Sequence, residues 1–319
     1  MTYAELLARF ANLRVLVVGD LMLDEYIHGR ATRISQEAPV MVVRQQRVHS
    51  VPGGAANVAK NLVALGATAH ILGVIGDDEP GSRLRSTLAD QPSTLIVDPT
   101  RPTTRKTRIL ADSAHQVLRI DDESTDPVDA AIESQLLHVA LELLDDADIV
   151  LFSDYVKGVL VPGLIQSILA AARPKGIVCV ANAKPARRLA SRGANLVSLN
   201  RPEAVQAAGV ARIDTADQAV RVAATLKEEM GVDHVLVTLN DDGMVTERHQ
   251  ISPVRVEVFD TAGAGDTTIA TVALGLAVAG DSREVFCLAA ESAASVVRKV
   301  GVAVPSPEDI AIISARGIL

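Results

Sequence analysis

One short segment near the carboxyl end of the chain combines glycines with carboxylates in a pattern suited to phosphate chemistry. Residues 260–266 read Asp-Thr-Ala-Gly-Ala-Gly-Asp and stand between a strand-like run and a long apolar, helix-like run. Glycines let a backbone approach a ligand closely, and the start of a helix presents unpaired N–H groups to an anion. A bound phosphate would repel the carboxylate of Asp266. Accepting a proton from a hydroxyl that attacks phosphorus would give this residue a purpose there.

The same residues also fit a purely structural turn, because Asp is a favoured N-cap and either Asp260 or Asp266 could cap the helix. Two other phosphate motifs are excluded. No Lys-Ser/Thr pair follows the glycines, as a Walker loop requires. The pair Gly263 and Gly265 lacks the third glycine and the early position of a dinucleotide fingerprint. Spacing alone leaves the structural turn and the catalytic anion site open.

The elements that must position this segment predict an α/β fold. Apolar strand-like runs alternate with helical patterns along most of the chain. The strands are expected at 14–19, 69–75, 148–153, 177–181, 195–199, 234–238 and 254–259, and the helices at 53–65, 79–89, 128–145, 160–173, 202–208, 214–230, 266–279 and 282–299. Such alternation implies a mostly parallel sheet with helices on both faces. We expect one domain over residues 1–319.

Two stretches, at about 25–50 and 103–120, do not fit a buried parallel sheet because polar and basic residues alternate with apolar ones there. We expect them to pair as a small projecting sheet, a lid over the site. A sheet of this size is not stable alone, so its apolar side chains are predicted to pack on the lid of a second copy in a homodimer, or else to cover the chain's own pocket. These side chains are Ile34, Val40, Val42, Ile109 and Val117.

Composition narrows the functional classes. The formal net charge of −8 argues against broad nucleic-acid binding, which needs a basic surface. Cys179 and Cys287 stand far apart in apolar runs, which predicts buried free thiols and a reducing compartment. No apolar run reaches the length of a membrane span and no signal peptide is evident, so a cytoplasmic protein is expected.

Three motifs in order resemble those of the ribokinase-type (PfkB) carbohydrate kinases. Residues 260–266 look like the DTxGAGD signature of that family, Gly53-Gly54-Ala-Ala-Asn57 like its GGxxxN sugar-binding turn, and Asn200-Arg-Pro-Glu203 like its NxxE motif. The resemblance covers nearly the whole chain. It implies a ribokinase-like fold and transfer of a phosphoryl group from ATP to a sugar, with Mg²⁺ and possible K⁺ as ions.

The resemblance also assigns roles. Asp266 would be the base, and the N–H groups around Gly263, Ala264 and Gly265 would hold the transferring phosphoryl group. Glu203 would handle Mg²⁺ through water, and Asp260 would lie near a monovalent cation. The nucleotide side would include Asn182, Lys184, Asn200, Thr238, Asn240 and Gly243. The sugar side would include Asp20, Asp24, Gly53, Gly54 and Asn57, with Arg33, Arg105, Lys106, Arg108 and Lys157 toward a sugar phosphate.

Further stretches look like the D-glycero-D-manno-heptose 7-phosphate kinases, some of which carry a fused nucleotidyltransferase domain. They include Arg33-Ile-Ser-Gln-Glu-Ala-Pro39, Pro102-Thr-Thr-Arg-Lys-Thr-Arg108 and Ser153-Asp-Tyr-Val-Lys-Gly158. This chain resembles the stand-alone kinase form, whose products supply lipopolysaccharide. Residues 182–200 and the segment after Thr238 depart from that pattern. A kinase for another sugar, sugar phosphate or nucleoside and a non-catalytic sugar-phosphate-binding relative therefore stay open.

Overall fold

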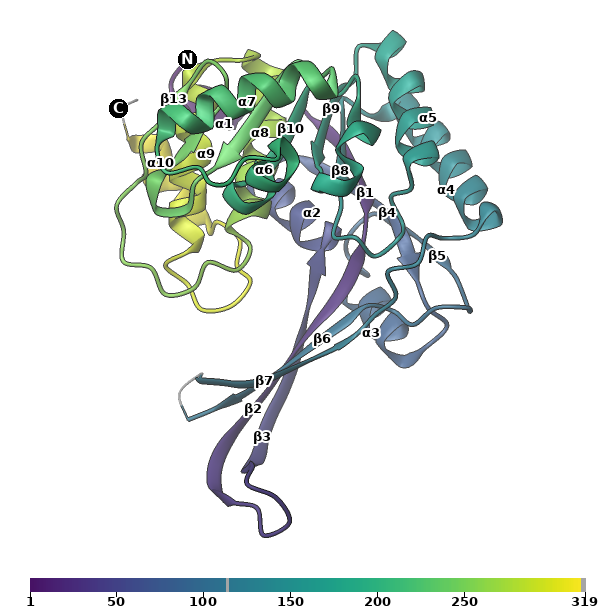
Figure 1. The fold of residues 1–319 in the computed structure, drawn as a ribbon. Coiled ribbons are helices and arrows are strands. Elements are labelled where there is room, and N and C mark those ends of the chain that lie inside the picture. Colours follow the sequence, from purple (N-terminus) through teal and green to yellow (C-terminus); the bar gives the residue numbers. More distant parts are fainter. Residues whose placement is uncertain (113–114, 317–319) are drawn as a thin grey trace.

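The computed structural model describes residues 1–112 and 115–316, and a nine-stranded sheet forms its centre (Figure 1). The strand order is β13-β12-β11-β10-β9-β8-β1-β4-β5. All neighbours pair in parallel except β12 and β13, which join one edge antiparallel. The strands are β1 (Arg14–Gly19), β4 (Thr68–Ile75), β5 (Ser93–Val97), β8 (Ile149–Ser153), β9 (Val178–Asn182), β10 (Leu196–Asn200), β11 (His234–Thr238), β12 (Met244–Val245) and β13 (Gln250–Ile251).

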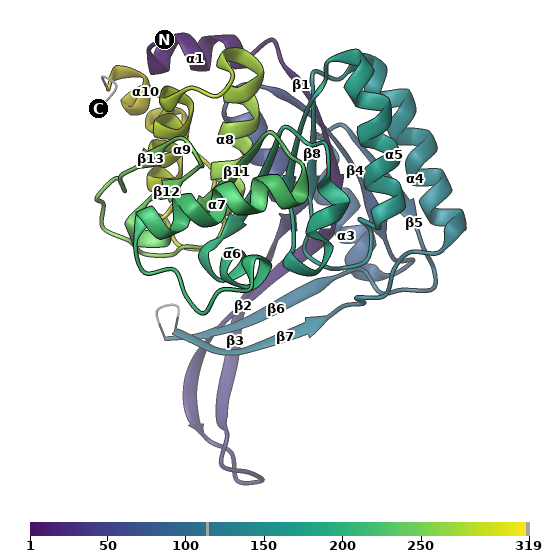
Figure 2. The same ribbon diagram turned by 45° about the horizontal axis from the view of Figure 1, so that its top comes forward.

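Helices cover both faces of this sheet, which confirms the predicted fold class (Figure 2). Successive side chains of a strand point to opposite faces, so β1 contributes to two cores. Leu16 and Val18 pack with α4, α5, α6 and α7, whereas Val15 and Val17 pack with α1, α2, α3, α8 and α9. The helices are α1 (Tyr3–Phe10), α2 (Ala55–Ala64), α3 (Glu79–Thr87), α4 (Ala130–Leu143), α5 (Pro162–Ala172), α6 (Arg201–Ala208), α7 (Ala216–Met230), α8 (Ala264–Ala279), α9 (Arg283–Val296) and α10 (Pro307–Ala315).

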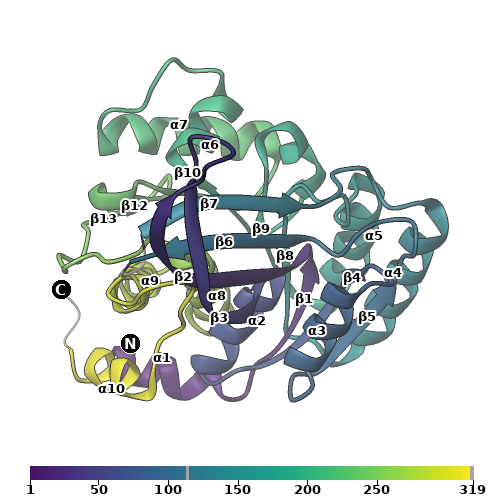
Figure 3. The ribbon, with the colours of Figure 1, turned by 90° about the horizontal axis from the view of Figure 1, so that it is seen from below.

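The two polar stretches form one four-stranded sheet of order β3-β2-β6-β7, as expected. Its strands are β2 (Leu21–Ile34), β3 (Met41–Gly54), β6 (Arg105–Ala111) and β7 (His115–Asp122). β2 and β3 have 14 residues each, and their hairpin projects from the body (Figure 2). Seen from below, the small sheet crosses the underside of the molecule (Figure 3). Residues 113–114 of the second stretch lie outside the described residues.

One predicted strand is wrong. Residues 254–259 alternate valine with charged residues, a strand-like pattern, but the structure shows no strand there. The physical reason is that Val254, Val256 and Val258 line a cavity instead of one face of a sheet. At the end of the segment, the N–H of Phe259 donates to the carbonyl of Val297 beyond α9, at 2.8 Å.

Two further observations concern the cysteines and the apolar character of the helices. Cys179 and Cys287 are both free and buried, as predicted. Within residues 1–112 and 115–316, no helix combines the length and the apolar character that crossing a membrane would require.

Candidate active site

Several of the predicted site residues stand where parallel strands end. Asn182, Asn200 and Thr238 are the last residues of β9, β10 and β11, and Asp20 follows the last residue of β1. The register aligns these ends, since Gly19 is opposite Ser153 and Asn200 is opposite Thr238. Ligands of open α/β sheets bind at the carboxyl edge of the strands, so the structure gathers these residues at the edge suited to binding.

The glycine-rich segment forms the entrance to α8. Gly263 is the N-cap and has φ +85°, a left-handed conformation that favours glycine. Asp260 shapes the preceding turn, because its carboxylate accepts the N–H of Ala262 and the N–H of Gly301, each at 2.9 Å. Asp266 lies at the third position of the helix and caps nothing. Neither carboxylate therefore caps α8: Asp260 shapes the turn before the helix, and Asp266 makes no cap hydrogen bond at its start.

Asp266 is buried, with 7% of its surface exposed, and each of its oxygens accepts one hydrogen bond. Nδ2 of Asn57 donates to Oδ2 at 2.6 Å, and the hydroxyl of Tyr155 donates to Oδ1 at 2.5 Å. Burial raises the pKa of Asp266, and these two hydrogen bonds oppose the rise. A buried carboxylate with a raised pKa is better matched to proton transfer near neutral pH than an exposed one.

Further hydrogen bonds between polar side chains of α2 and α8 support the contact between Asn57 and Asp266. Asn61, one turn after Asn57, accepts a hydrogen bond from the hydroxyl of Thr267 at 2.7 Å, and its own amide donates to the carbonyl of Asn57 at 2.9 Å. The glycines before α2 allow close approach to β2. A Cβ on Gly53 would lie 2.0 Å from Oδ2 of Asp24, and Gly54 has φ +60°. The predicted turn thus places Asn57 against Asp266 and Asp24 beside Gly53.

Asp20 is completely buried, and the described contacts of its carboxylate are with backbone. It accepts the N–H groups of Tyr155 at 2.7 Å, Lys157 at 3.0 Å and Val159 at 3.2 Å. The loop after β8 is therefore held by a carboxylate at the end of β1. Neighbouring Asp154 is also buried, and burial raises its pKa to about 6.

The basic residues predicted for a sugar phosphate are mostly paired with carboxylates. Arg108 pairs with Asp24 at 2.5 Å, and Arg105 pairs with Asp122 at 3.5 Å. Glu123 joins two lysines, with Lys157 at 2.7 Å and Lys106 at 3.1 Å; Lys106 also reaches Asp121 at 3.1 Å. Arg33 lies apart from them, exposed near the far end of β2. A phosphate would have to exchange these carboxylate partners for its own oxygens.

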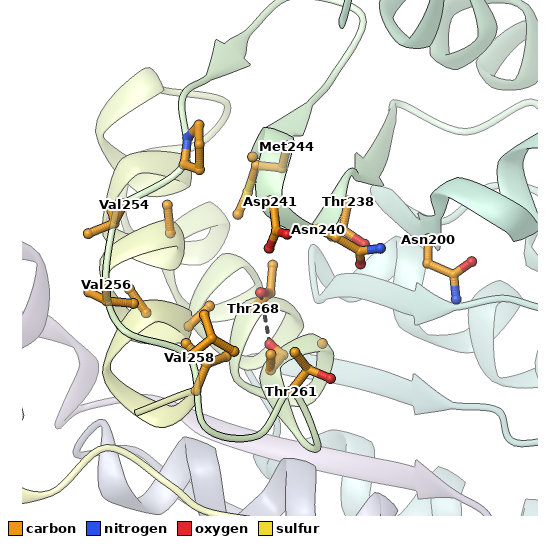
Figure 4. Close-up of a pocket in the computed structure, with 18 residues that line it drawn as sticks. Asn200, Thr238, Asn240, Asp241, Met244, Val254, Val256, Val258, Thr261 and Thr268 are labelled. Carbon is orange, nitrogen blue, oxygen red and sulfur yellow. Dashed lines mark hydrogen bonds between the residues drawn. The ribbon is translucent and has the colours of Figure 1, made fainter. Parts of the chain in front are cut away.

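A cavity of about 340 Å³ lies on the other side of the α8 entrance (Figure 4). Thr261, Ala264, Gly265 and Thr268 form the wall that it shares with the glycine-rich segment. The opposite walls contain four of the residues predicted for the nucleotide: Asn200, Thr238, Asn240 and Gly243. The lining also includes Asp241 and a set of apolar side chains: Met244, Pro253, Val254, Val256, Val258, Ala290, Ala293, Ala294 and Val297. An apolar slot with polar groups at one end suits a flat heterocycle linked to phosphates.

Lys184 and Glu203 lie beside Tyr155 and Asn200. Their side chains form an ion pair at 2.6 Å, and the Lys184 ammonium lies 5.6 Å from the centre of the Tyr155 ring. Glu203 also completes a capping box, because its other oxygen accepts the N–H of Asn200 at 2.8 Å. Both carboxylate oxygens of Glu203 are thus engaged. Among the described residues, no group of three or more His, Cys, Asp and Glu side chains is placed to hold a metal.

Sequence reasoning missed three contributors: Tyr155, Asn61 and Thr267. Asn61 could have been found from its spacing of four residues after Asn57, which places both on one face of a helix. Tyr155 was read only as part of a subfamily stretch, since no local pattern links it to Asp266, 111 positions later.

Together these residues place a buried carboxylate, the glycine-rich start of a helix and a cavity next to one another, and phosphoryl transfer to a hydroxyl uses groups of these kinds. The fold is ribokinase-like. The structure of phosphofructokinase-2 from Escherichia coli in complex with potassium superimposes with a TM-score of 0.79 at 21% identity, covering 95% of this chain and 98% of that one. The structure of Arabidopsis thaliana ribokinase complexed with ribose and ATP gives 0.73 at 18% identity, covering 96% and 99%. Its match to a carbohydrate kinase family over residues 12–309 shows that this chain is a phosphotransferase that acts on sugars.

Residues 12–309 match the pfkB family carbohydrate kinase model, and the chain belongs to that family. Among curated proteins it is 40% identical over 307 residues to the bifunctional protein HldE of Gluconobacter oxydans, and 41% identical over 314 residues to that of Syntrophotalea carbinolica. These alignments cover 93% and 95% of this chain. The chain spans 63% of the length of each of these relatives.

Proposed function

We propose that this chain transfers the γ-phosphoryl group of ATP to the anomeric hydroxyl of D-glycero-D-manno-heptose 7-phosphate. The products are the 1,7-bisphosphate and ADP. The observation that supports this proposal most is the buried carboxylate of Asp266, which two donors hold at the entrance to α8, directly after Gly265 in the wall of the cavity. The heptose assignment is supported by the resemblance of the chain to heptose 7-phosphate kinases and by its identity to proteins named HldE.

In the reaction, Asp266 accepts the proton of the anomeric hydroxyl as that oxygen bonds to the γ-phosphorus. The bond from this phosphorus to the β-phosphate oxygen breaks, and ADP leaves. Backbone N–H groups around Gly263 and Gly265 face the transferring group at the start of α8. Most of the catalysis is positioning and stabilisation of charge.

The nucleotide occupies the cavity, with its phosphates directed at Thr261 and Gly265. Mg²⁺ bound to the phosphates offsets their negative charge. Such ions usually keep several waters and use few protein ligands, which fits a Glu203 whose oxygens are already engaged and which would reach the ion through water. Asp260, at the turn beside this site, is the residue we assign to a monovalent cation such as K⁺.

The sugar lies between Asn57, Asp24 and Asp266, and its 7-phosphate lies toward the small sheet. Arg108 is the central contact, because it is half-buried and adjacent to Asp24. Arg105 and Lys106 follow along β6, with Lys157 near them through Glu123. Binding exchanges the carboxylate partners of these cations for the oxygens of a phosphate, which carries a charge of about −1.5 to −2 and therefore attracts them more strongly than a single carboxylate does.

The small sheet is also the surface that we assign to dimer formation. Of its apolar side chains, Ile34, Val40 and Val117 are exposed, as are Leu118 and Ile120, which the sequence analysis did not single out. A second copy placed against this surface would remove these side chains from water. ATP as the donor and two free buried thiols support a location in the cytoplasm.

The deciding experiment measures ADP release with heptose 7-phosphate, fructose 6-phosphate, ribose and adenosine side by side. Two charge-assisted contacts to the phosphate predict a preference of about 100-fold or more in kcat/KM for the phosphorylated sugar over a free sugar. Fastest turnover of heptose 7-phosphate supports the proposal. Equal or faster turnover of an unphosphorylated acceptor would refute the heptose 7-phosphate assignment and leave the sugar-kinase class standing.

A further inference from the structure

The loop after β8 brings an unassigned side chain into contact with the proposed base. The hydroxyl of Tyr155 donates to Oδ1 of Asp266 at 2.5 Å, opposite the Asn57 amide on Oδ2. A carboxylate held at both oxygens cannot rotate freely. One donor on each oxygen still leaves acceptor capacity for an incoming hydroxyl, because a carboxylate offers about four lone-pair directions.

Two buried carboxylates fix the backbone of the loop after β8. The carboxylate of Asp20 accepts three backbone N–H groups between Tyr155 and Val159, and Asp20 itself is completely buried. Next to Tyr155, the carboxylate of Asp154 accepts the N–H of Val156 at 2.7 Å. The backbone of Tyr155 is thus anchored on both sides along the chain, so buried carboxylates set the position from which its side chain reaches Asp266.

The backbone of Val156 shows that surrounding contacts impose the conformation of this loop. It has φ +59°, in the left-handed region that a β-branched residue rarely adopts. Strain of this kind persists only where the surrounding structure determines it, and it gathers at functional sites. Here the carboxylates of Asp20 and Asp154 hold the loop in this conformation by accepting its backbone N–H groups, and the loop carries the Tyr155 hydroxyl to Asp266.

We propose that Tyr155 is a positioning residue for the base, and that Asp20 sets it in place through the loop after β8. This inference rests on the proposed function, since it takes Asp266 as the proton acceptor. The Tyr155 hydroxyl stabilises the ionised carboxylate against the cost of burial and directs it toward the acceptor hydroxyl.

The groups around Asp266 and Tyr155 shift the pKa values of both side chains in the directions that this role of Tyr155 requires. Burial and the carboxylate of Asp24 raise the pKa of Asp266, while Tyr155, Asn57 and Lys184 lower it. In turn, burial and the charges of Asp266, Asp24 and Asp20 raise the pKa of Tyr155 well above its ordinary value. The phenol therefore keeps its proton at any working pH and remains a donor.

The test is Tyr155→Phe, which keeps the ring and removes the donor. Loss of a hydrogen bond to a charged group predicts a fall in kcat of about 10-fold to 100-fold. Because the pKa of Asp266 then rises, the acid limb of the kcat profile should move up by about 1 pH unit or more. Assays use ATP and whichever of heptose 7-phosphate, fructose 6-phosphate and ribose turns over fastest. Tyr3→Phe, in α1 away from this edge, is the matched control and should leave kcat and its pH profile unchanged.

A loss of rate without movement of the acid limb would overturn the inference, because a merely structural tyrosine would lower the rate at every pH. The double variant Tyr155→Phe with Asp266→Asn adds a second criterion. If Tyr155 acts through Asp266, it costs no further rate in the Asp266→Asn background. An additive loss, with Asp266→Asn itself about 100-fold slower than the wild type, overturns the role of Tyr155 alone, whereas an Asp266→Asn that turns over like the wild type overturns it together with the proposed base.

A substrate-independent readout is available because the chain has three tyrosines and no tryptophan. Ultraviolet titration of tyrosinate in the wild type and in Tyr155→Phe identifies the Tyr155 transition by difference. Asp266→Asn should shift that transition to lower pH, since the neighbouring negative charge is removed. An unmoved transition would show that the two side chains are not in contact and would overturn the inference.

Discussion

Asn57 and Asp266 are 209 positions apart in the chain, yet the amide of one donates to the carboxylate of the other at 2.6 Å. The contact joins the first turn of α2 to the first turn of α8, and a second hydrogen bond, from the hydroxyl of Thr267 to Asn61, joins the same two helices. The two motifs at opposite ends of the sequence therefore meet at one carboxylate, and this carboxylate is the first target for mutation.

Asp266→Asn should lower kcat by about 100-fold or more, the range for losing general base catalysis. Binding of ATP and sugar should survive, because the helix entrance and the Asn57 contact do not depend on the charge. Steady-state ADP release and calorimetric binding measure the two effects. Asp90→Asn, an exposed change after α3, is the control. Turnover near that of the wild type would contradict the assignment of the base.

Ala293→Leu should fill part of the cavity, whose wall includes Ala293 on α9. The larger side chain would overpack the cavity when ATP binds, at a cost of about 1–3 kcal/mol. This cost predicts a rise in the KM for ATP of about 10-fold, with little change in the KM for the sugar. Ala311→Leu on the exposed side of α10 controls for the added side chain. If instead the KM for the sugar rises and that for ATP does not, the cavity is not the nucleotide site.

Arg108→Ala should raise the KM for heptose 7-phosphate and leave the KM for ATP unchanged. The reason is the loss of a charge-assisted contact, worth about 1.5–3 kcal/mol, to the far phosphate. The KM for a free sugar such as ribose should change much less, which separates phosphate binding from general damage. Arg221→Ala on the exposed face of α7 is the control. Parallel rises for phosphorylated and free sugars would contradict a phosphate contact.

Asp154→Asn should stabilise the protein at pH 7.5 and not near pH 4. Burial raises the pKa of Asp154 from 3.8 to about 6 in the folded chain. Between these two values the folded state binds more protons than the unfolded state, so this residue makes stability fall as pH rises and the loss is complete above the folded pKa. The gain at pH 7.5 is at most about 3 kcal/mol. Thermal unfolding across pH measures it, and an equal Tm difference at both pH values would argue against a buried ionised carboxylate.

The small sheet predicts a dimer in solution at micromolar concentration. Leu118→Glu should produce monomers, because it places a charge in a surface that the dimer would bury. Leu118 is 50% exposed, and Leu141 on α4 is 41% exposed, so Leu141→Glu is a matched control that should remain dimeric. Size-exclusion chromatography with light scattering gives the masses. A monomeric wild type would contradict the assignment of this surface.

The amino-acid sequence by itself determined the class of fold and the position of the main motif. Alternation in β1 sends Val15 and Val17 to one core and Leu16 and Val18 to the other, which is local information. Gly263 and the apolar run after Asp266 likewise mark a turn into a buried helix. The α/β pattern and the small polar sheet were predictable for the same reason, because spacing along the chain records which face of an element is buried.

Tertiary structure decided which charges are free and which are paired. The sequence shows Arg108, Lys106 and Lys157 as basic residues, but it cannot show that Asp24 and Glu123 meet them, since those partners arrive from other strands and loops. It also cannot distinguish alternating valines on a strand from alternating valines along a cavity, as at 254–259. Above all, Tyr155 reaches Asp266 only because Asp20 shapes a loop 135 residues away, and contacts over such distances depend on packing rather than on local pattern.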